Sequence, residues 1–232
     1  MNNSEKYFQL GISCYKTGKF DEAIKNFNIA IKLNSDYEIA YLNRGFTYTE
    51  KKEPEKAIID YNRVIQLNPN NATAYTYLGI SYLMQNNCSK AIKNFNRAIE
   101  LAPNYIEPYL HRSIAYFQMN DETKARDDYK RVMELNFKLA LEYNRLAAFH
   151  MKKGEYEQAI SHFSKIIELD INDKNLAIAY SNRGFCYANI GKYDESIADC
   201  NRSLELNPEN NEAYSIRNMA QNRKNNVKVP TA

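Results

Sequence analysis

The sequence of 232 residues predicts an all-α fold built from repeated pairs of helices, and three observations support this prediction. A similar stretch of 34 residues recurs six times in tandem, which is typical of stacked repeat proteins. Within each copy, large and small apolar residues recur every three or four residues, which is the period of an α-helix. The chain also has only seven glycines and six prolines, so long regular segments are favoured over turns.

The clearest copy spans residues 72–105, and the other five span 4–37, 38–71, 106–139, 140–173 and 177–210. When Ala72 is given position 1, every copy has a tyrosine at position 4, and small residues dominate positions 8 and 20. Small residues there allow two helices to approach closely, and aromatic residues fill the space beside them. Each copy is therefore predicted to form helix A over positions 1 to about 14 and helix B over about 18 to 31. Position 24 is occupied by Phe27, Tyr61, Phe95, Tyr129, Phe163 and Cys200.

Local signals mark the ends of these helices. Acidic or hydroxyl residues occupy position 18, where they suit a helix N-terminus. Glycine occupies position 15 in three copies, and Pro69, Pro103 and Pro208 occupy position 32, where helix B must stop. A partial seventh copy over residues 211–224 has a polar end, so we predict a capping helix there and a flexible tail over 225–232. Residues 1–224 are thus predicted to be one domain.

The pattern resembles the tetratricopeptide repeat family, and the third copy carries all of its characteristic residues: Tyr75, Leu78, Gly79, Tyr82, Ala91, Phe95, Ala98 and Pro103. The resemblance implies a right-handed superhelical solenoid of six repeats with a C-terminal capping helix. It also implies that the A helices line a concave groove.

Repeats four and five depart from the family pattern. Phe137 and Ile171 stand at position 32 in place of proline, and residues 174–176 are inserted between repeats five and six. We expect a regular stack through repeats one to four and a local change of angle near residues 170–177. The alternative for the insertion is a longer surface loop, because such insertions cost little free energy.

In this family, ligands usually meet helix A positions 2, 5, 9, 12 and 13. These positions form a largely apolar strip in repeats one to four, and they are more polar in repeats five and six. We predict that a peptide segment or an amphipathic helix of a partner protein binds this strip. The alternative is that these side chains pack against neighbouring A helices. The predicted peptide-binding residues are Phe8, Ile12, Tyr15, Leu42, Phe46, Thr76, Ile80, Leu83, Met84, Leu110, Ile114 and Phe117.

The clamp by which some family members grip acidic chaperone tails is not predicted here. Asn43 and Asn182 match the asparagine in the middle of that clamp. The lysine and arginine positions around them do not match: Phe8 lies upstream of Asn43, and Glu212 and Ile216 lie downstream of Asn182.

Arginine replaces the usual leucine at position 7 in repeats two, four and six and in the partial seventh copy, as Arg44, Arg112, Arg183 and Arg217. We expect a structural role in which the stem packs and the guanidinium reaches a carboxylate or solvent. A ladder of arginines for an acidic ligand is the weaker alternative, because only alternate repeats supply it.

No catalytic, cofactor-binding or metal-binding residue is predicted. The three histidines stand at different repeat positions, with no serine or cysteine at a spacing that would bring a nucleophile close. The four cysteines form no CxxC pair, which fits a reducing compartment. Cys186 and Cys200 are interpreted as small buried residues, with a redox pair as the alternative.

These observations predict a non-catalytic scaffold or adaptor for protein–protein interaction, without a cofactor. The alternative is homo-oligomeric assembly through the apolar strip or the ends of the solenoid. Nucleic-acid binding ranks lower, because the net charge is only +3 and the groove has few Lys or Arg residues. No signal-peptide pattern and no run of 18 apolar residues is visible, so we expect a cytoplasmic protein without a membrane span.

Overall fold

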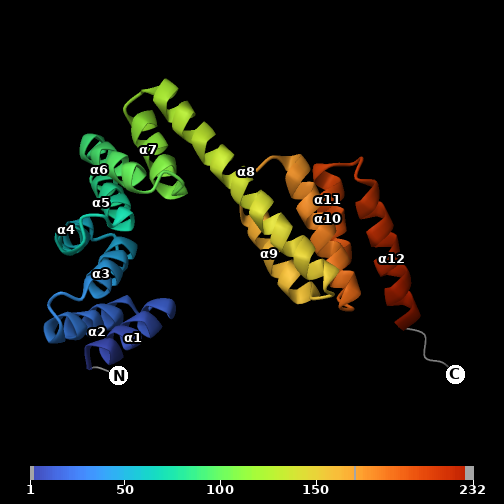
Figure 1. Ribbon diagram of the computed structural model, residues 1–232, viewed down its shortest axis with the longest axis horizontal. Coiled ribbons are helices and arrows are strands. Elements are labelled where there is room, and N and C mark those ends of the chain that lie inside the picture. Colours follow the sequence, from blue (N-terminus) through green and yellow to red (C-terminus); the bar gives the residue numbers. More distant parts are fainter. Residues whose placement is uncertain (1–2, 170, 228–232) are drawn as a thin grey trace. The chain divides into compact units, whose positions relative to one another are not determined.

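The computed structural model describes residues 3–169 and 171–227, and this described part consists of twelve helices without strands (Figure 1). The all-α, helix-turn-helix architecture predicted from the sequence is therefore confirmed. The helices are α1 (Asn3–Lys16), α2 (Phe20–Leu33), α3 (Glu38–Glu50), α4 (Pro54–Leu67), α5 (Ala72–Met84), α6 (Cys88–Leu101), α7 (Ile106–Gln118), α8 (Glu122–Lys152), α9 (Tyr156–Glu168), α10 (Asp173–Asn189), α11 (Tyr193–Leu206) and α12 (Asn211–Val227).

The chain divides into two compact units within α8. Unit 1 covers residues 1–132, and unit 2 covers residues 133–232. Unit 1 holds repeats one to three and most of repeat four, while unit 2 holds repeats five and six and the C-terminal helix. The single domain predicted over residues 1–224 stays a prediction.

The turn between helices A and B has the same backbone geometry in all six repeats. Position 15 is left-handed at Gly18, Gly154 and Gly191, with φ of 74°, 75° and 79°. Lys52, Asn86 and Asn120 take the same conformation in the other three repeats, with φ of 58°, 57° and 60°. Glycine adopts this region without steric cost, so its choice at position 15 follows from the turn itself.

Each repeat of unit 1 up to the third packs an aromatic ring from helix B over a glycine of helix A. A Cβ atom placed on Gly79 would lie 2.5 Å from the ring of Phe95, and one on Gly45 would lie 2.6 Å from Tyr61. Both rings are fully buried. The absence of a side chain at position 8 is what lets the two helices of a repeat approach so closely.

We call the contact between two successive repeats a joint. Two small residues of helix A mark each joint in repeats two and three. Positions 3 and 10 are Ala40 and Thr47 in repeat two, and Ala74 and Ser81 in repeat three, and all four are fully buried. Repeat six and α12 follow the same pattern with small buried residues. In repeat one, Lys6 and Ser13 occupy these positions and are exposed. Small residues at both positions 3 and 10 therefore accompany the burial of helix A in repeats two, three and six.

The turn predicted between repeats four and five is wrong. Helix B of repeat four and helix A of repeat five form one helix, the 31-residue α8 (Figure 1). The segment Asn136-Phe137-Lys138-Leu139 contains neither proline nor glycine, so nothing stops the helix after position 31. Repeats four and five are therefore connected by a continuous helix and not by a turn.

Two expectations about the C-terminal third also change. The inserted residues 174–176 extend α10 to 17 residues, with the Asn172 side chain accepting a hydrogen bond from the backbone of Asn175, so they do not form the longer loop. Helix α12 continues to Val227, so residues 225–227 are helical and not part of a flexible tail. The rest of the predicted tail, residues 228–232, lies outside the described residues.

Candidate functional site

The predicted apolar strip in unit 1 separates into buried and accessible residues. Phe8 is buried against Phe27 and Tyr37, with ring centroids 5.9 and 5.3 Å apart. Thr76 has no exposed surface, and its hydroxyl donates a hydrogen bond to the carbonyl of Ala72 at 2.9 Å. Neither of these two residues can touch a ligand in this conformation.

Phe46 belongs to the joint between repeats two and three. Its ring centroid lies 4.4 Å from that of Tyr77 and 6.0 Å from that of Tyr61, within one hydrophobic cluster that also contains Ala57 and Leu78. Phe46 therefore packs against a neighbouring A helix, as the alternative interpretation of the strip predicted.

The remaining strip residues keep accessible surface. Met84 and the repeat-four residues Ile114 and Phe117 are exposed, and the other six are half-buried: Ile12, Tyr15, Leu42, Ile80, Leu83 and Leu110. Ile114 and Phe117 line a hollow of about 510 Å³ together with the helix B residues Ala125 and Tyr129. This hollow lies on the end of repeat four and not along the A helices alone.

Unit 2 has a hollow of about 410 Å³ on its own A helices, which the sequence had placed in the more polar end of the groove. Met151 of α8, Phe185 of α10 and Ile216 of α12 provide its apolar lining. Asn182, Asn211, Ser215 and Glu212 complete it, and Glu212 is exposed. The hollow thus combines apolar side chains with one carboxylate. Position 12 supplies Met151, and a comparison of position 12 across all repeats would have found it.

A second, smaller hollow of about 130 Å³ in unit 2 is lined by Leu141, Ile178 and their neighbours. Leu141 and Ile178 both occupy position 2 of their repeats and are exposed. Sequence reasoning missed both, although position 2 belongs to the ligand-facing set of the family. Unit 2 is therefore more apolar on its A helices than predicted.

The arginines at position 7 form a repeated structural pair. Arg44 donates from Nε and Nη2 to the two carboxylate oxygens of Asp60 at 2.8 and 2.5 Å. Arg112 with Asp128 and Arg183 with Asp199 repeat this geometry at 2.6–2.8 Å. The predicted structural role of these arginines is confirmed for Arg44, Arg112 and Arg183. The signal that was missed is an aspartate at position 23 in the same repeats, 16 residues after each arginine.

The same arginines also join one repeat to the repeat before it. Arg44 donates to Asn28 at 2.5 Å and Arg112 to Asn96 at 2.6 Å, and in unit 2 Arg217 donates to Asn201 at 2.9 Å. The hydrogen bonds to Asp199 raise the pKa of Arg183, whereas burial raises the pKa of the Asp60 carboxyl group. Because both groups of each pair are engaged inside the protein, these arginines are not available as a ladder for an acidic ligand.

The histidines and cysteines stand in packing environments. His111 stacks on Phe95, and burial lowers its pKa. His150 stacks on His162 and lies 2.6 Å from the carboxylate of Glu155. Cys186 and Cys200 are fully buried free thiols, and burial raises their pKa values to about 12 and about 11. Within the described residues, no group of His, Cys, Asp or Glu side chains has an arrangement that could hold a metal ion.

Family models for the tetratricopeptide repeat match nearly the whole chain. They cover residues 39–71, 72–105, 106–139, 140–173 and 177–210, and a related TPR repeat model covers residues 11–52. The chain belongs to the tetratricopeptide repeat family. Repeats four and five are matched separately, so the fused α8 is a feature of their geometry and not of a lost repeat.

Curated relatives share short stretches with this tetratricopeptide repeat protein. The Hsp70-Hsp90 organizing protein of Triticum aestivum is 46% identical over 55 residues, which is 23% of this chain and 9% of that protein. The mitochondrial import receptor subunit TOM70 of Homo sapiens is 33% identical over 81 residues, which is 34% of this chain and 13% of that protein. The chain thus spans about a tenth of the length of these relatives.

Solved structures share the fold. The structure of MamA residues 41 to the end, from Desulfovibrio magneticus RS-1, is 26% identical, with a TM-score of 0.56 over 59% of this chain and 77% of that chain. The crystal structure of the APC/C hetero-tetramer Cut9-Hcn1 is 17% identical, with a TM-score of 0.56 over 94% of this chain and 43% of that one. In the described part of the chain, no helix combines the length and apolar character needed to cross a bilayer.

Proposed function

We propose that this protein is a non-catalytic scaffold that holds a peptide segment or an amphipathic helix of a partner protein against its A helices. The observation that carries the proposal is the 410 Å³ hollow of unit 2, where Met151, Phe185 and Ile216 converge from three helices. A volume of this size is within the range of pockets that bury a ligand. Unit 1 offers the same type of surface separately, through its accessible strip residues, above all Leu83 and Met84.

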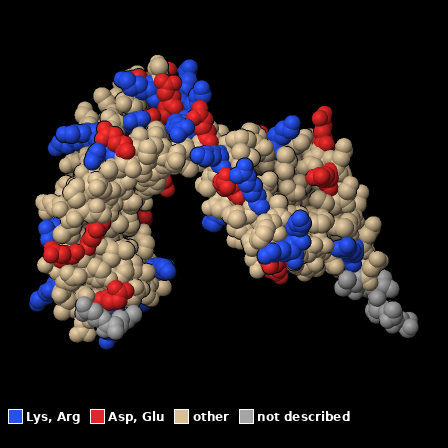
Figure 2. Space-filling model, viewed as in Figure 1, with Lys and Arg blue, Asp and Glu red and all other residues tan. Residues whose placement is uncertain are grey.

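The chemistry of the unit 2 hollow suggests the kind of segment that would fit. Its apolar residues would bury one or two large apolar side chains, at roughly 1.5–3 kcal/mol each. The exposed carboxylate of Glu212 favours a neighbouring Lys or Arg on the ligand over an acidic tail. Charges of both signs are interspersed on the face shown in Figure 2, which supports a protein ligand rather than a nucleic acid.

A relative of known structure supports peptide binding at the level of the family. The first TPR domain of Spaghetti (RPAP3), solved bound to the HSP90 peptide SRMEEVD, shares the fold with this chain at 24% identity. The peptide that this relative binds is acidic. For this chain we propose a ligand of different charge, because Glu212 stands in the hollow. Four free thiols further support a reducing compartment such as the cytoplasm.

Selection from a random peptide library against the full chain tests this proposal. We expect enrichment of peptides that place large apolar residues next to Lys or Arg. Phe185→Asp should abolish the enrichment, and Glu212→Lys should shift it toward acidic peptides. Ile59→Asp is the matched control, because Ile59 is an exposed apolar residue far along the chain on α4. Peptides that bind Phe185→Asp as tightly as the wild type would contradict the proposal.

A further inference from the structure

The two hollows of unit 2 share the same pair of helices. The small hollow, of about 130 Å³, is lined by Leu141 of α8 and Ile178 of α10. The large hollow, of about 410 Å³, is lined by Met151 of α8 and Phe185 of α10. The earlier residues of both helices meet at one hollow and the later residues meet at the other, so α8 and α10 run in the same direction there. The two hollows therefore follow one another along a single pair of parallel helices.

The spacing of the two hollows suits an extended chain. Ile178 and Phe185 are seven residues apart on α10, which is about 10.5 Å at ~1.5 Å per residue. Leu141 and Met151 are ten residues apart on α8, which is about 15 Å by the same rise. An extended segment advances ~3.3 Å per residue, and its residues i and i+4 point to the same side about 13 Å apart. Residues i and i+2 are only about 7 Å apart, which is too short.

The small hollow has the character of a socket for one apolar side chain. Phe137, Leu141 and Ile178 line it and are each 42–46% exposed, while Ile166 and Ile171 are buried within it. Large exposed apolar side chains in a cluster indicate an interaction surface. The hollow is smaller than the ~300–1,000 Å³ of pockets that bury a whole small-molecule ligand. A single aliphatic side chain of a larger ligand therefore fits it best.

Asparagine side chains border both hollows. Asn144 and Asn175 line the small hollow, and Asn182 and Asn211 line the large one. Within the described part of the chain, the side-chain amides of these four residues form no hydrogen bond. An amide both donates and accepts, so it can pair with the N–H and C=O groups of a peptide backbone. An α-helical ligand uses most of those groups internally, whereas an extended segment has them available. The asparagines thus favour an extended ligand over a helical one.

We propose that unit 2 binds an extended segment of a partner protein with two large apolar residues four positions apart, one in each hollow. Glu212 is the only charged side chain among the described residues that line either hollow, and it lines the large one. A Lys or Arg of the segment therefore lies beside the apolar residue in the large hollow. This inference rests on the proposed function and defines the ligand more closely.

Fluorescence anisotropy with short synthetic peptides tests the spacing. Each peptide consists of Ser and Thr, apart from two leucines and one lysine beside either the first or the second leucine. The leucines are placed from two to seven positions apart. We expect the full chain to bind the peptide with a spacing of four most tightly. Tightest binding at a spacing of seven would overturn the proposal, because leucines seven apart span about 10.5 Å on one side of a helix.

The variant Leu141→Ser tests the small hollow. It should weaken binding of the spacing-four peptide roughly tenfold or more, to the affinity of a peptide with a single leucine. Leu146→Ser is the matched control, because both leucines lie on α8 and are 46% exposed, but only Leu141 lines the hollow. Circular dichroism checks that both variants retain their helices. Asn144→Leu should weaken binding about two- to tenfold, and unchanged binding would contradict the extended conformation.

Phe185→Asp separates this inference from the proposed function. It should remove binding of every peptide, because Phe185 lines the large hollow. If Phe185→Asp removes binding but Leu141→Ser binds as tightly as Leu146→Ser, the use of two hollows is wrong and the proposed function stands. If Phe185→Asp binds as tightly as the wild type, or if no peptide binds the wild type, both proposals are wrong.

Discussion

Repeats three and five match the same family description, but they differ in how they meet the repeat before them. Repeat three begins after Pro69, its helix α5 is capped by Asn71, and Ala74 and Ser81 are buried in a joint. Repeat five begins inside α8 without proline or cap, and Glu142 and Phe149 stand exposed at the same two positions. The comparison teaches that the family pattern specifies the helix pair, whereas position 32 of the preceding repeat decides whether a turn or a continuous helix leads into it.

The largest expected effect compares a buried ring with a partly exposed ring at position 24 of two repeats. Phe95→Ala should destabilise unit 1 by about 3–5 kcal/mol, because the ring is fully buried over Gly79. Tyr129→Ala, at the same position of repeat four, should cost far less, because its ring is partly solvated. Chemical denaturation of the two variants measures the difference. Equal losses of stability would contradict the difference in burial between the two rings.

The next effect concerns the arginine–aspartate pairs, which repeats two, four and six have and repeats one and three lack. Asp60→Ala leaves the half-buried Arg44 without its carboxylate and should cost about 3 kcal/mol or more. The double substitution Arg44→Leu with Asp60→Asn reproduces the residues that repeats one and three carry at positions 7 and 23, and should cost much less. Denaturant unfolding of the single and double variants provides the test. A double variant as unstable as Asp60→Ala would refute this compensation.

A smaller effect should distinguish unit 2 by its response to alkaline pH. Burial raises the pKa values of Cys186 and Cys200 from 9.0 to about 12 and about 11, so both thiols stay protonated in the folded state after they ionise in the unfolded state. The contribution of the protonated thiols to the free energy of unfolding is complete below pH 9, and it is lost as the pH rises toward 11 and 12. Each thiol adds a slope of about −1.4 kcal/mol per pH unit in that window.

The double variant Cys186→Ala with Cys200→Ala is the control for this pH dependence. Lysines and tyrosines also titrate above pH 9, so the relevant quantity is the slope that the wild type has in excess of the double variant. Thermal denaturation between pH 8 and 11 measures both slopes. If the two slopes coincide, the thiols are not shielded as the structure shows.

Most of the fold could be predicted because each repeat contains the local sequence signals for its own two helices and the turn between them. Tyrosine at position 4, small residues at 8 and 20 and a turn at position 15 are visible without knowledge of distant contacts. The sequence-based prediction failed in two cases: where a residue that stops a helix was missing, and where two residues far apart in the sequence form a pair. Phe137 was recognised as a missing proline, but its consequence, an uninterrupted α8, was not deduced.

The candidate site was less predictable, because the groove positions were judged by residue type and not by what covers them. Thr76 and Phe46 face other residues of the chain, and Met151 and Phe185 form a hollow that the more polar neighbours concealed. Arg44 and Asp60, 16 residues apart, could have been paired from the sequence, since both change together between alternate repeats. Burial is a property of neighbouring repeats, so a single repeat could not reveal it.

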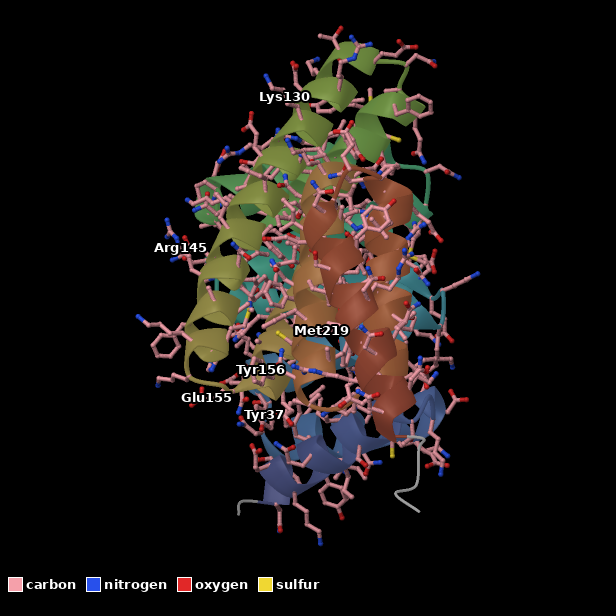
Figure 3. The ribbon with its side chains drawn as sticks, turned by 90° about the vertical axis from the view of Figure 1, so that its right-hand side faces the viewer. Tyr37, Lys130, Arg145, Glu155, Tyr156 and Met219 are labelled. Atoms are coloured by element: carbon pink, nitrogen blue, oxygen red, sulfur yellow. The ribbon has the colours of Figure 1, made fainter. Side chains whose placement is uncertain are left out.

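The central claim is that α8 runs as one continuous helix from repeat four into repeat five, where the family pattern predicts two helices separated by a turn. Lys130 and Arg145 both lie on α8 in Figure 3 and are exposed. Each can be replaced by cysteine and spin-labelled in a variant whose native cysteines have been substituted. A continuous helix places their Cα atoms about 22 Å apart, at ~1.5 Å per residue. Pulsed electron–electron distance measurement should find a narrow distribution near that separation. A distance near about 10 Å, typical of two packed antiparallel helices, would contradict the account.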